Sequence, residues 1–291
     1  MATTHSKIAP ARINWHDLLP VLVGIVCLLV MARRTLHTWW YEYTAPESYF
    51  AHAPLIPVMA AFMLWSGRKK IAELTITPYW PAAWALGTAA ALHIFANGQD
   101  MEAIMSYSLV LMVWSGILLV LGKEFVKSQW LPIGFLALMV PLPGPVLNDL
   151  THGLQQMSTA GASLALAVLG FENWRTGYEL ELSNYTLFVD VPCSGFKTLL
   201  ALLTFNAFFA YMVDGSAKKR IWLFVASLPL ALLINVTRIS AIAVVGECIG
   251  DNAAHAFHDY SGVFTVLLGF AVLFGIARLF GCRKFAGLAI F

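Results

Sequence analysis

Three side chains in the second half of the chain could act together in nucleophilic catalysis: Cys193, Arg238 and His258. A thiolate is a strong nucleophile, a histidine carries protons near neutral pH, and a guanidinium can stabilise a thiolate or a tetrahedral oxyanion. Each residue also has an ordinary interpretation. Cysteine is a small hydrophobe in buried helices, an arginine can extend to lipid headgroups, and an interfacial histidine can simply be solvated.

Cys193 lies in the segment VPCSGF, followed by Ser194 and Gly195, where an apolar helix is predicted to begin. The positive end of the helix dipole and the unpaired N–H groups of a first turn would favour its thiolate. Cys248 is the competing candidate, because it lies near His255 on the same predicted side. Cys27 and Cys282 are predicted to be structural. The four cysteines show neither a CxxC metal spacing nor close pairing, so we expect no metal, cofactor or disulfide framework.

Several neighbours could support the three residues. Lys197 follows Cys193 by four positions and would share its helix face, where it could favour the thiolate, bind a substrate carboxylate or extend outward without either role. Asn235 lies one turn before Arg238 and could hydrogen-bond inside the bundle. His255 could share the helix face of His258, and Asp259 could orient the imidazole ring.

The elements that position these residues are predicted to be membrane helices. Of the 291 residues, 59% are hydrophobic and 12% are charged, whereas soluble domains have about 25% charged residues. The net charge of +2 gives no indication of nucleic-acid binding. A span needs roughly 20 apolar residues. The sequence predicts an all-α integral membrane protein with about eight transmembrane helices, near 17–36, 53–67, 80–97, 103–121, 130–143, 194–213, 221–245 and 261–281.

The orientation follows from lysine and arginine in the short connections. Twelve of the eighteen basic residues would lie on one side, which is therefore predicted to be cytoplasmic. Both termini share that side, with residues 1–16 as a flexible tail, and acidic connections lie opposite. One pair, Arg33 and Arg34, conflicts with this rule at the outer end of the first span. Arg238 would lie near the outer boundary, at the same depth as Cys193 and His258.

Two segments before Cys193 complete the predicted fold. Residues 145–170 have helical spacing but a polar first half, which predicts an interfacial or re-entrant helix rather than a crossing. A crossing would move the basic cluster at 218–220 to the outer side. Residues 177–191 alternate apolar and polar side chains, which predicts a small outer β-hairpin broken at Ser183 and Asn184. No linker divides the chain, so we expect a single multipass membrane domain over residues 1–291.

The ordered motifs resemble the exosortase/archaeosortase family. SYFAHAPLIPVMAAFMLW at 48–65 resembles an early span of that family, with His52 as its histidine. MVPLPGPVLNDLTHGLQQMSTAGASLALAVLG at 139–170 resembles its Pro-Leu-Pro turn and the helix that follows. VPCSGF, NVTRIS and HDYSGVF resemble its Cys-Ser-Gly, Asn-x-x-Arg and His-x-x-x-Gly motifs. Together these motifs cover most of residues 48–270. Two positions depart from the pattern, Lys197 in place of a small or apolar residue and Val263 in place of tryptophan.

The resemblance implies a bacterial inner-membrane cysteine protease-transpeptidase with its active site on the periplasmic face. Cys193 would be the nucleophile, Arg238 the motif arginine and His258 the base. The implied partners, besides the bilayer, are exported proteins with a C-terminal sorting signal, which consists of a Pro-Glu-Pro-like motif, a transmembrane helix and a basic tail. An exopolysaccharide-biosynthesis context is a further implication. The alternatives are a transporter or flippase, which would need midplane polar groups, and a non-catalytic component of an exopolysaccharide assembly.

Overall fold

The computed structural model describes residues 15–46 and 48–289, so the tail predicted over residues 1–16 falls almost wholly outside the described part. The chain forms two compact units, one of Met1–Thr38 and Ile76–Glu124, the other of Trp39–Thr75 and Phe125–Phe291. All of the predicted site residues belong to the second unit.

The first unit is built from α4 (Ala82–Gly98) and from most of α1 (Trp15–Thr44) and α5 (Glu102–Ser128), whose last residues belong to the second unit. The span predicted at 103–121 ends at a kink in α5, where Gly122 has φ +80°. A Cβ atom there would overlap the backbone oxygen of Thr77. Arg34 lies in the α1 helix and forms an ion pair with Asp100, with 2.5 Å between Nη2 and Oδ1. This ion pair offsets one of the two charges that conflict with the orientation rule.

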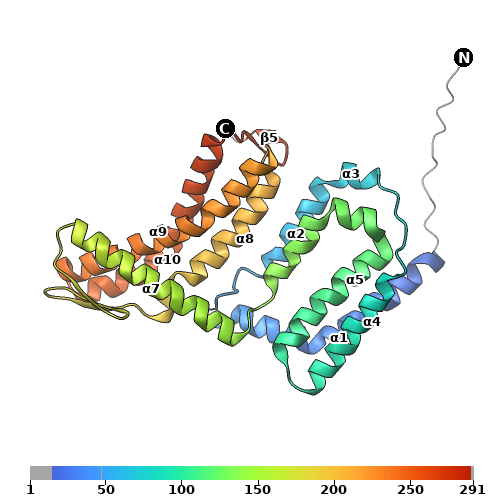
Figure 1. Cartoon of the computed structure of the whole chain (residues 1–291), viewed down its shortest axis with the longest axis horizontal. Helices are drawn as coiled ribbons and strands as arrows, with labels where there is room; N and C mark the ends of the chain where they lie inside the picture. Colours follow the sequence, from blue (N-terminus) through green and yellow to red (C-terminus); the bar gives the residue numbers. More distant parts are fainter. Residues whose placement is uncertain (1–14, 47, 290–291) are drawn as a thin grey trace, which may run out of the picture. The chain divides into compact units, whose positions relative to one another are not determined.

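The second unit contains the remaining helices, seen in Figure 1. Its core consists of α8 (Phe196–Met212), α9 (Ala217–Ile249) and α10 (Asp251–Leu279), which pack against one another, and α7 (Gly144–Val168) packs along α9. Leu202, Ile234 and Leu273 are almost fully buried between α8, α9 and α10. The helices of this unit are α2 (Leu55–Ser66), α3 (Arg68–Ala72), α6 (Trp130–Phe135), η1 (Leu136–Met139), α7 (Gly144–Val168), η2 (Val191–Ser194), α8 (Phe196–Met212), α9 (Ala217–Ile249) and α10 (Asp251–Leu279).

Small residues bring these helices close together. Gly161 on α7 faces Val236 on α9, where a Cβ atom would lie 2.6 Å from the valine Cγ2. Gly269 on α10 faces Leu202 on α8 in the same way, at 2.8 Å. Because lipid tails are as apolar as leucine, close packing of this kind, rather than exclusion from water, holds membrane helices together.

The described residues contain fewer obvious spans than the eight predicted. Four helices are long and apolar enough to cross a bilayer: Leu19–Thr44 within α1, and α5, α9 and α10. The count becomes five if the bent pair of Trp130–Met139 and α7 is one span. The apolar runs predicted at 53–67, 80–97 and 194–213 form the helices α2, α4 and α8, with 12, 17 and 17 residues. At 1.5 Å per residue, about 18 Å of α2 falls short of a hydrocarbon core about 30 Å thick. The protein is a mostly helical, multipass membrane protein, and the inside orientation of its termini stays a prediction.

The segment predicted as an interfacial or re-entrant helix is α7, which bends by 89° from the helix before it. Pro141 and Pro143 lie in the break, and proline lacks the N–H that would continue a helix. Its placement in the bilayer stays a prediction. The β element after α7 is confirmed as an antiparallel sheet, β1 (Trp174–Thr176), β2 (Glu179–Glu181) and β3 (Thr186–Phe188), which has one strand more than predicted. Its second turn falls at Leu182–Tyr185, as the Ser183-Asn184 break indicated.

A short C-terminal hairpin was not predicted. Strands β4 (Lys284–Phe285) and β5 (Leu288–Ala289) pair after α10. The Asp214 carboxylate, in the loop between α8 and α9, accepts hydrogen bonds from the N–H groups of Arg283 and Lys284 at 2.7 and 2.8 Å. The Lys284 N–H in particular holds the pKa of Asp214 below its usual range. This carboxylate therefore fastens the end of the chain to the α8–α9 loop.

Candidate catalytic site

Cys193 lies in the 3-10 turn η2, not in the first turn of a long helix as predicted. Gly195 adopts φ +84°, and α8 begins only at Phe196. A left-handed backbone conformation interrupts the helix, and glycine adopts it most readily because it has no Cβ atom. Because Cys193 is not on α8, the argument that placed Lys197 one turn below it on the same helix face is wrong. The Cys193 backbone N–H instead donates to the carbonyl of Asp190, at 2.8 Å.

The turn that carries Cys193 is held from behind by α7 and α9. The Asn235 amide donates to the Cys193 carbonyl at 3.1 Å and to the Ser158 hydroxyl at 2.9 Å. The Ser158 hydroxyl lies 3.3 Å from the carbonyl of the fully buried Ser194. Gly195 is required here for a second reason, since a Cβ atom would lie 2.6 Å from the Asn235 side chain. Asn235 was predicted to hydrogen-bond within the bundle, and these contacts are the bonds it makes.

His258 lies on α10 and reaches Cys193 across 65 residues of sequence. Its Nε2 is 2.6 Å from the Cys193 Sγ. On the other side of the ring, Nδ1 is 3.3 Å from Oδ1 of Asp259. The histidine side chain is 36% exposed and that of Asp259 78% exposed, so protons can exchange with water. A thiol, an imidazole and a carboxylate are therefore in contact in that order, which is an arrangement that could support covalent acyl transfer.

Arg238 contacts the same turn of α10 but not the sulfur. Its Nε donates to the Ser261 hydroxyl at 2.8 Å, and its Nη2 donates to the carbonyl of His258 at 3.2 Å. Ser261 in turn donates to that carbonyl at 2.9 Å. The guanidinium thus binds the backbone of the residue whose imidazole faces Cys193. The three residues predicted to converge do so around His258.

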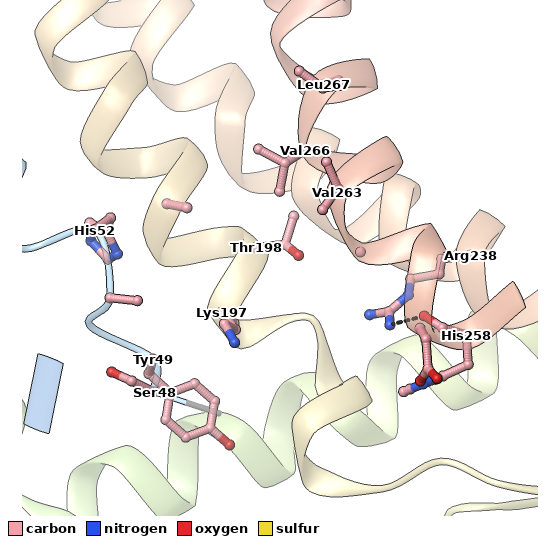
Figure 2. Close-up of a pocket in the computed structure, with 14 residues that line it drawn as sticks. Ser48, Tyr49, His52, Lys197, Thr198, Arg238, His258, Val263, Val266 and Leu267 are labelled. Carbon is pink, nitrogen blue, oxygen red and sulfur yellow. Dashed lines mark hydrogen bonds and ion pairs between the residues drawn. The ribbon is translucent and has the colours of Figure 1, made fainter. Parts of the chain in front are cut away.

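Two cavities meet at His258 and Asp259, which line both. The first, of about 650 Å³, is shown in Figure 2 and is also lined by Lys197, Arg238 and His52. The second, of about 350 Å³, contains Cys193 and is walled by β3 and the segment that follows it.

The other predicted residues are distributed around these cavities. Lys197 lines the first cavity, away from the one that contains Cys193. His52 lines the same cavity, and its Nε2 is 3.2 Å from the Thr204 hydroxyl of α8. His255 lines the second cavity, and its ring lies 3.5 Å from the Asp251 carboxylate. Cys248 is exposed and lines neither cavity.

Sequence reasoning missed Ser158, Ser261 and Asp190. A detectable signal existed for Ser158, because Thr151, Gln155, Ser158 and Ala162 are spaced as one helix face and all are buried. Gln155 on that face hydrogen-bonds the Val189 carbonyl, just before the turn of Cys193. Tyr185 was missed as well. Tyr185 lines the second cavity, and burial, followed by the Asp251 carboxylate, raises the pKa of its phenol above the ordinary value.

Comparison with models of known protein families assigns the chain to one of them. The model of the transmembrane exosortase family matches residues 39–275, which is more than half of the sequence. The chain belongs to the transmembrane exosortase family. No curated protein and no solved structure matches it. The resemblance drawn from the ordered motifs is therefore confirmed. Exosortases are in general cysteine protease-like enzymes, and the matched region of this exosortase contains every residue of the candidate site.

Proposed function

We propose that this exosortase is a membrane cysteine protease-transpeptidase that cleaves the C-terminal sorting signal of exported proteins. Membership of the family implies substrates of the PEP-CTERM type. The observation that carries the proposal is the 2.6 Å approach of Cys193 Sγ to His258 Nε2, with Asp259 on the far side of the ring. We place the site at the periplasmic face of the bacterial inner membrane, where exported proteins arrive.

In the first half of the reaction, His258 Nε2 accepts the thiol proton and Cys193 Sγ attacks the scissile carbonyl carbon. The carbonyl π electrons move onto oxygen and give a tetrahedral oxyanion. When this intermediate collapses, the C–N bond breaks and the imidazolium donates its proton to the leaving amine. The product is a thioester between Cys193 and the substrate, and the signal helix is released.

In the second half, water or an acceptor amine attacks the thioester carbonyl and loses a proton to His258. The C–S bond breaks, the proton returns to the sulfur, and the processed protein leaves. Asp259 keeps Nδ1 as the protonated nitrogen, so that Nε2 faces the sulfur as the base. Arg238 anchors the α10 turn that carries His258 and adds positive charge beside the reacting centre. Asn235 and Ser158 hold the Cys193 turn in place.

The test is replacement of the nucleophile. An exported reporter that ends in a Pro-Glu-Pro motif, a transmembrane helix and a basic tail is co-expressed with the protein, and its cleavage is followed by mass shift. Cys193→Ala should abolish cleavage, whereas Cys248→Ala, which removes a thiol from outside both cavities, should leave it unchanged. Normal cleavage by the Cys193→Ala variant would rule out the mechanism.

A further inference from the structure

The strand β3 lies beside the nucleophile and has one open edge. In the described part of the chain the sheet order is β1-β2-β3, so β3 (Thr186–Phe188) pairs with β2 on one side and with no strand on the other. An unpaired strand edge presents N–H and C=O groups that another extended chain can bind. The chain passes from β3 directly into the turn of Cys193, whose N–H donates to the Asp190 carbonyl. The open edge therefore leads to the sulfur.

The hydrogen bonds of the hairpin determine which backbone groups face this edge. The N–H of Val189 donates to the Tyr178 carbonyl at 2.9 Å, on the side of β2. In an antiparallel pair, residues that bond the neighbouring strand alternate with residues whose N–H and C=O point away from it. Leu187, two positions earlier, therefore also bonds toward β2. The N–H and C=O groups of Thr186 and Phe188 point to the open edge.

The cavity that contains Cys193 runs along the open edge of β3. Its lining includes four consecutive residues, Leu187, Phe188, Val189 and Asp190. Successive side chains of a strand point to opposite faces, so a cavity against one face would be lined by every second residue. A lining of consecutive residues places this cavity of about 350 Å³ at the edge. Its other walls come from α9 and α10, with Ile239, Ile242, Ala254 and His258.

The edge is held in place by α9. The Asn184 N–H and side-chain amide, in the turn before β3, donate to the Glu247 carboxylate at 2.9 and 2.8 Å. The next residue, Tyr185, packs so closely on Gly246 that a Cβ atom would have no room there. At the other end of the strand, Val189 is buried in the cluster that includes α9 side chains. An edge that is already ordered can bind a peptide without the cost of ordering a loop.

We infer that the substrate binds by strand addition, in which the residues before the scissile bond pair with the open edge of β3 and run parallel to it. The inference rests on the proposed function, which identifies the peptide as the one that Cys193 attacks. In strand addition, main-chain hydrogen bonds provide affinity and alternate side chains enter pockets. The backbone groups of Thr186 and Phe188 are then binding groups that take no part in the bond changes at the sulfur.

The direction of the substrate follows from the position of the sulfur beyond the end of β3. A peptide whose scissile carbonyl meets Cys193, and whose earlier residues lie beside β3, runs in the same direction as the strand. The residues after the scissile bond lead into the transmembrane helix of the proposed signal, so they are not available for an extended pairing. A motif with two prolines separated by one residue is compatible with this arrangement, because every second N–H of an added edge strand faces away from its partner.

Cross-linking tests the pairing. The background has the four native cysteines replaced, with alanine at position 193, so that a bound reporter is not cleaved. Thr186→Cys is combined with reporters that carry a single cysteine at successive positions before the scissile bond, and disulfide formation is measured. Because side chains alternate along a strand, we expect cross-links at every second reporter position. In Phe188→Cys the strongest position should move two residues toward the scissile bond, as a parallel pair requires.

The matched control is Thr176→Cys in the same background. Thr176 is an exposed threonine of β1, the strand at the far edge of the same sheet, and it lines neither cavity. It should give few cross-links with the reporter and no alternation.

A cleavage measurement on chains that keep Cys193 gives an independent test. Proline is tolerated in an edge strand where its missing N–H would face away from the neighbouring strand, as the Phe188 N–H does. Phe188→Pro should therefore fold and still lower reporter cleavage about tenfold, because it removes a main-chain donor to the substrate. Arg175→Pro is the matched control. Arg175 pairs with Leu180, whose backbone groups bond toward β3, so the Arg175 N–H points to the far edge of β1, and cleavage should be unchanged.

The outcomes separate this inference from the function on which it rests. Cleavage that depends on Cys193, together with cross-links that do not alternate or that are equal for Thr186→Cys and Thr176→Cys, would overturn strand addition and leave the peptidase intact. A strongest position that moves away from the scissile bond in Phe188→Cys would refute the parallel direction. Disulfide-linked pairs of Thr186→Cys chains that exclude the reporter would assign the edge to self-association and overturn the inference. Absence of Cys193-dependent cleavage would overturn the proposed function and the inference with it.

Discussion

At the scale of single residues, the arrangement around His258 decides what the site can do. Its two ring nitrogens face different groups, Sγ of Cys193 at 2.6 Å and Oδ1 of Asp259 at 3.3 Å. In the proposed mechanism the first contact carries the proton to and from sulfur, and the second keeps the proton on Nδ1. Arg238 binds the backbone of the same residue. The imidazole is thus held through both its side chain and its main chain.

Replacing Asp259 tests the orienting contact. In Asp259→Asn the amide can present its N–H to Nδ1, which would leave the proton on Nε2 and remove the base from the sulfur. We expect reporter cleavage to fall at least tenfold, and the rate of Cys193 alkylation by iodoacetamide at pH 7 to fall with it, because less thiolate forms. A purely structural role would not slow alkylation.

The control for this variant is Asp251→Asn. That carboxylate lies on the same helix and contacts His255, not His258. It should leave both rates within about twofold of the unaltered protein. If Asp259→Asn cleaved the reporter and reacted with iodoacetamide at the original rates, Asp259 would have no part in orienting the base.

At the scale of elements, the main feature is how α7 and α9 support a turn that has little structure of its own. The turn of Cys193 is four residues long, and its carbonyl groups bond to side chains of the two helices behind it. Asn235 makes the central connection, because its one amide group bonds both Ser158 and the Cys193 carbonyl. The position of the sulfur is therefore set by buried side chains behind the turn.

Asn235→Ala should displace the turn without removing any reacting group. Loss of a buried hydrogen-bond donor leaves its acceptors unpaired, at a cost of about 1–3 kcal/mol. We expect about a tenfold to hundredfold loss of reporter cleavage, while insertion into the membrane is unchanged. Ser240→Ala is the matched control, since this buried α9 hydroxyl bonds only the carbonyl one turn earlier in the contacts described. Equal cleavage by the two variants would contradict the supporting role.

The C-terminal hairpin gives a second prediction at this scale. Asp214 has a lowered pKa because backbone N–H groups, that of Lys284 first, stabilise its charged form. The stability that the Asp214 carboxylate gives to the folded hairpin should therefore be complete at neutral pH. It should be lost as the pH falls below the ordinary pKa of 3.8 and through the lower pKa of the folded state. Asp214→Asn should release the hairpin at pH 7, which faster trypsin cleavage after Arg283 or Lys284 in detergent would report. Glu73→Gln, whose carboxylate has no described contact with the hairpin, should cleave as slowly as the unaltered protein.

The sequence predicts helices and strands correctly wherever a run of apolar residues, or an alternation of apolar and polar residues, continues without interruption. Apolar runs located α2, α4, α8 and α9, and the alternation at 177–191 located the sheet. The sequence could not show that Gly195 interrupts the helix after Cys193, because the segment VPCSGF is continuous with the apolar run that follows it. It also placed the start of the last helix at 261 and not at Asp251, since polar residues around His255 and His258 belong to the helix but not to an apolar span. The partners of Asn235 depend on tertiary packing, which no local pattern contains.

At the scale of the whole molecule, the proposed function depends on the side of the membrane on which each connection lies. Four or five helices qualify as spans by length and composition, and the shorter α2, α4 and α8 do not. With the eight crossings predicted from the sequence, the shorter helices included, the side of the membrane on which Cys193 lies depends on α7. If α7 re-enters on one side, the sheet and Cys193 face the periplasm and the loop between α8 and α9 is cytoplasmic. If α7 crosses fully, these positions exchange sides.

Single cysteines can separate the two arrangements. In a background with the four native cysteines replaced, Ser183→Cys lies in the exposed turn between β2 and β3, and Ser216→Cys lies in the exposed loop before α9. A re-entrant α7 predicts that an impermeant maleimide labels position 183 in intact spheroplasts and position 216 only after permeabilisation. The basic cluster at 218–220 supports this result, because lysine and arginine accumulate in cytoplasmic loops. The reverse labelling would place Cys193 in the cytoplasm, where exported substrates could not reach it, and would refute the proposed function together with the orientation.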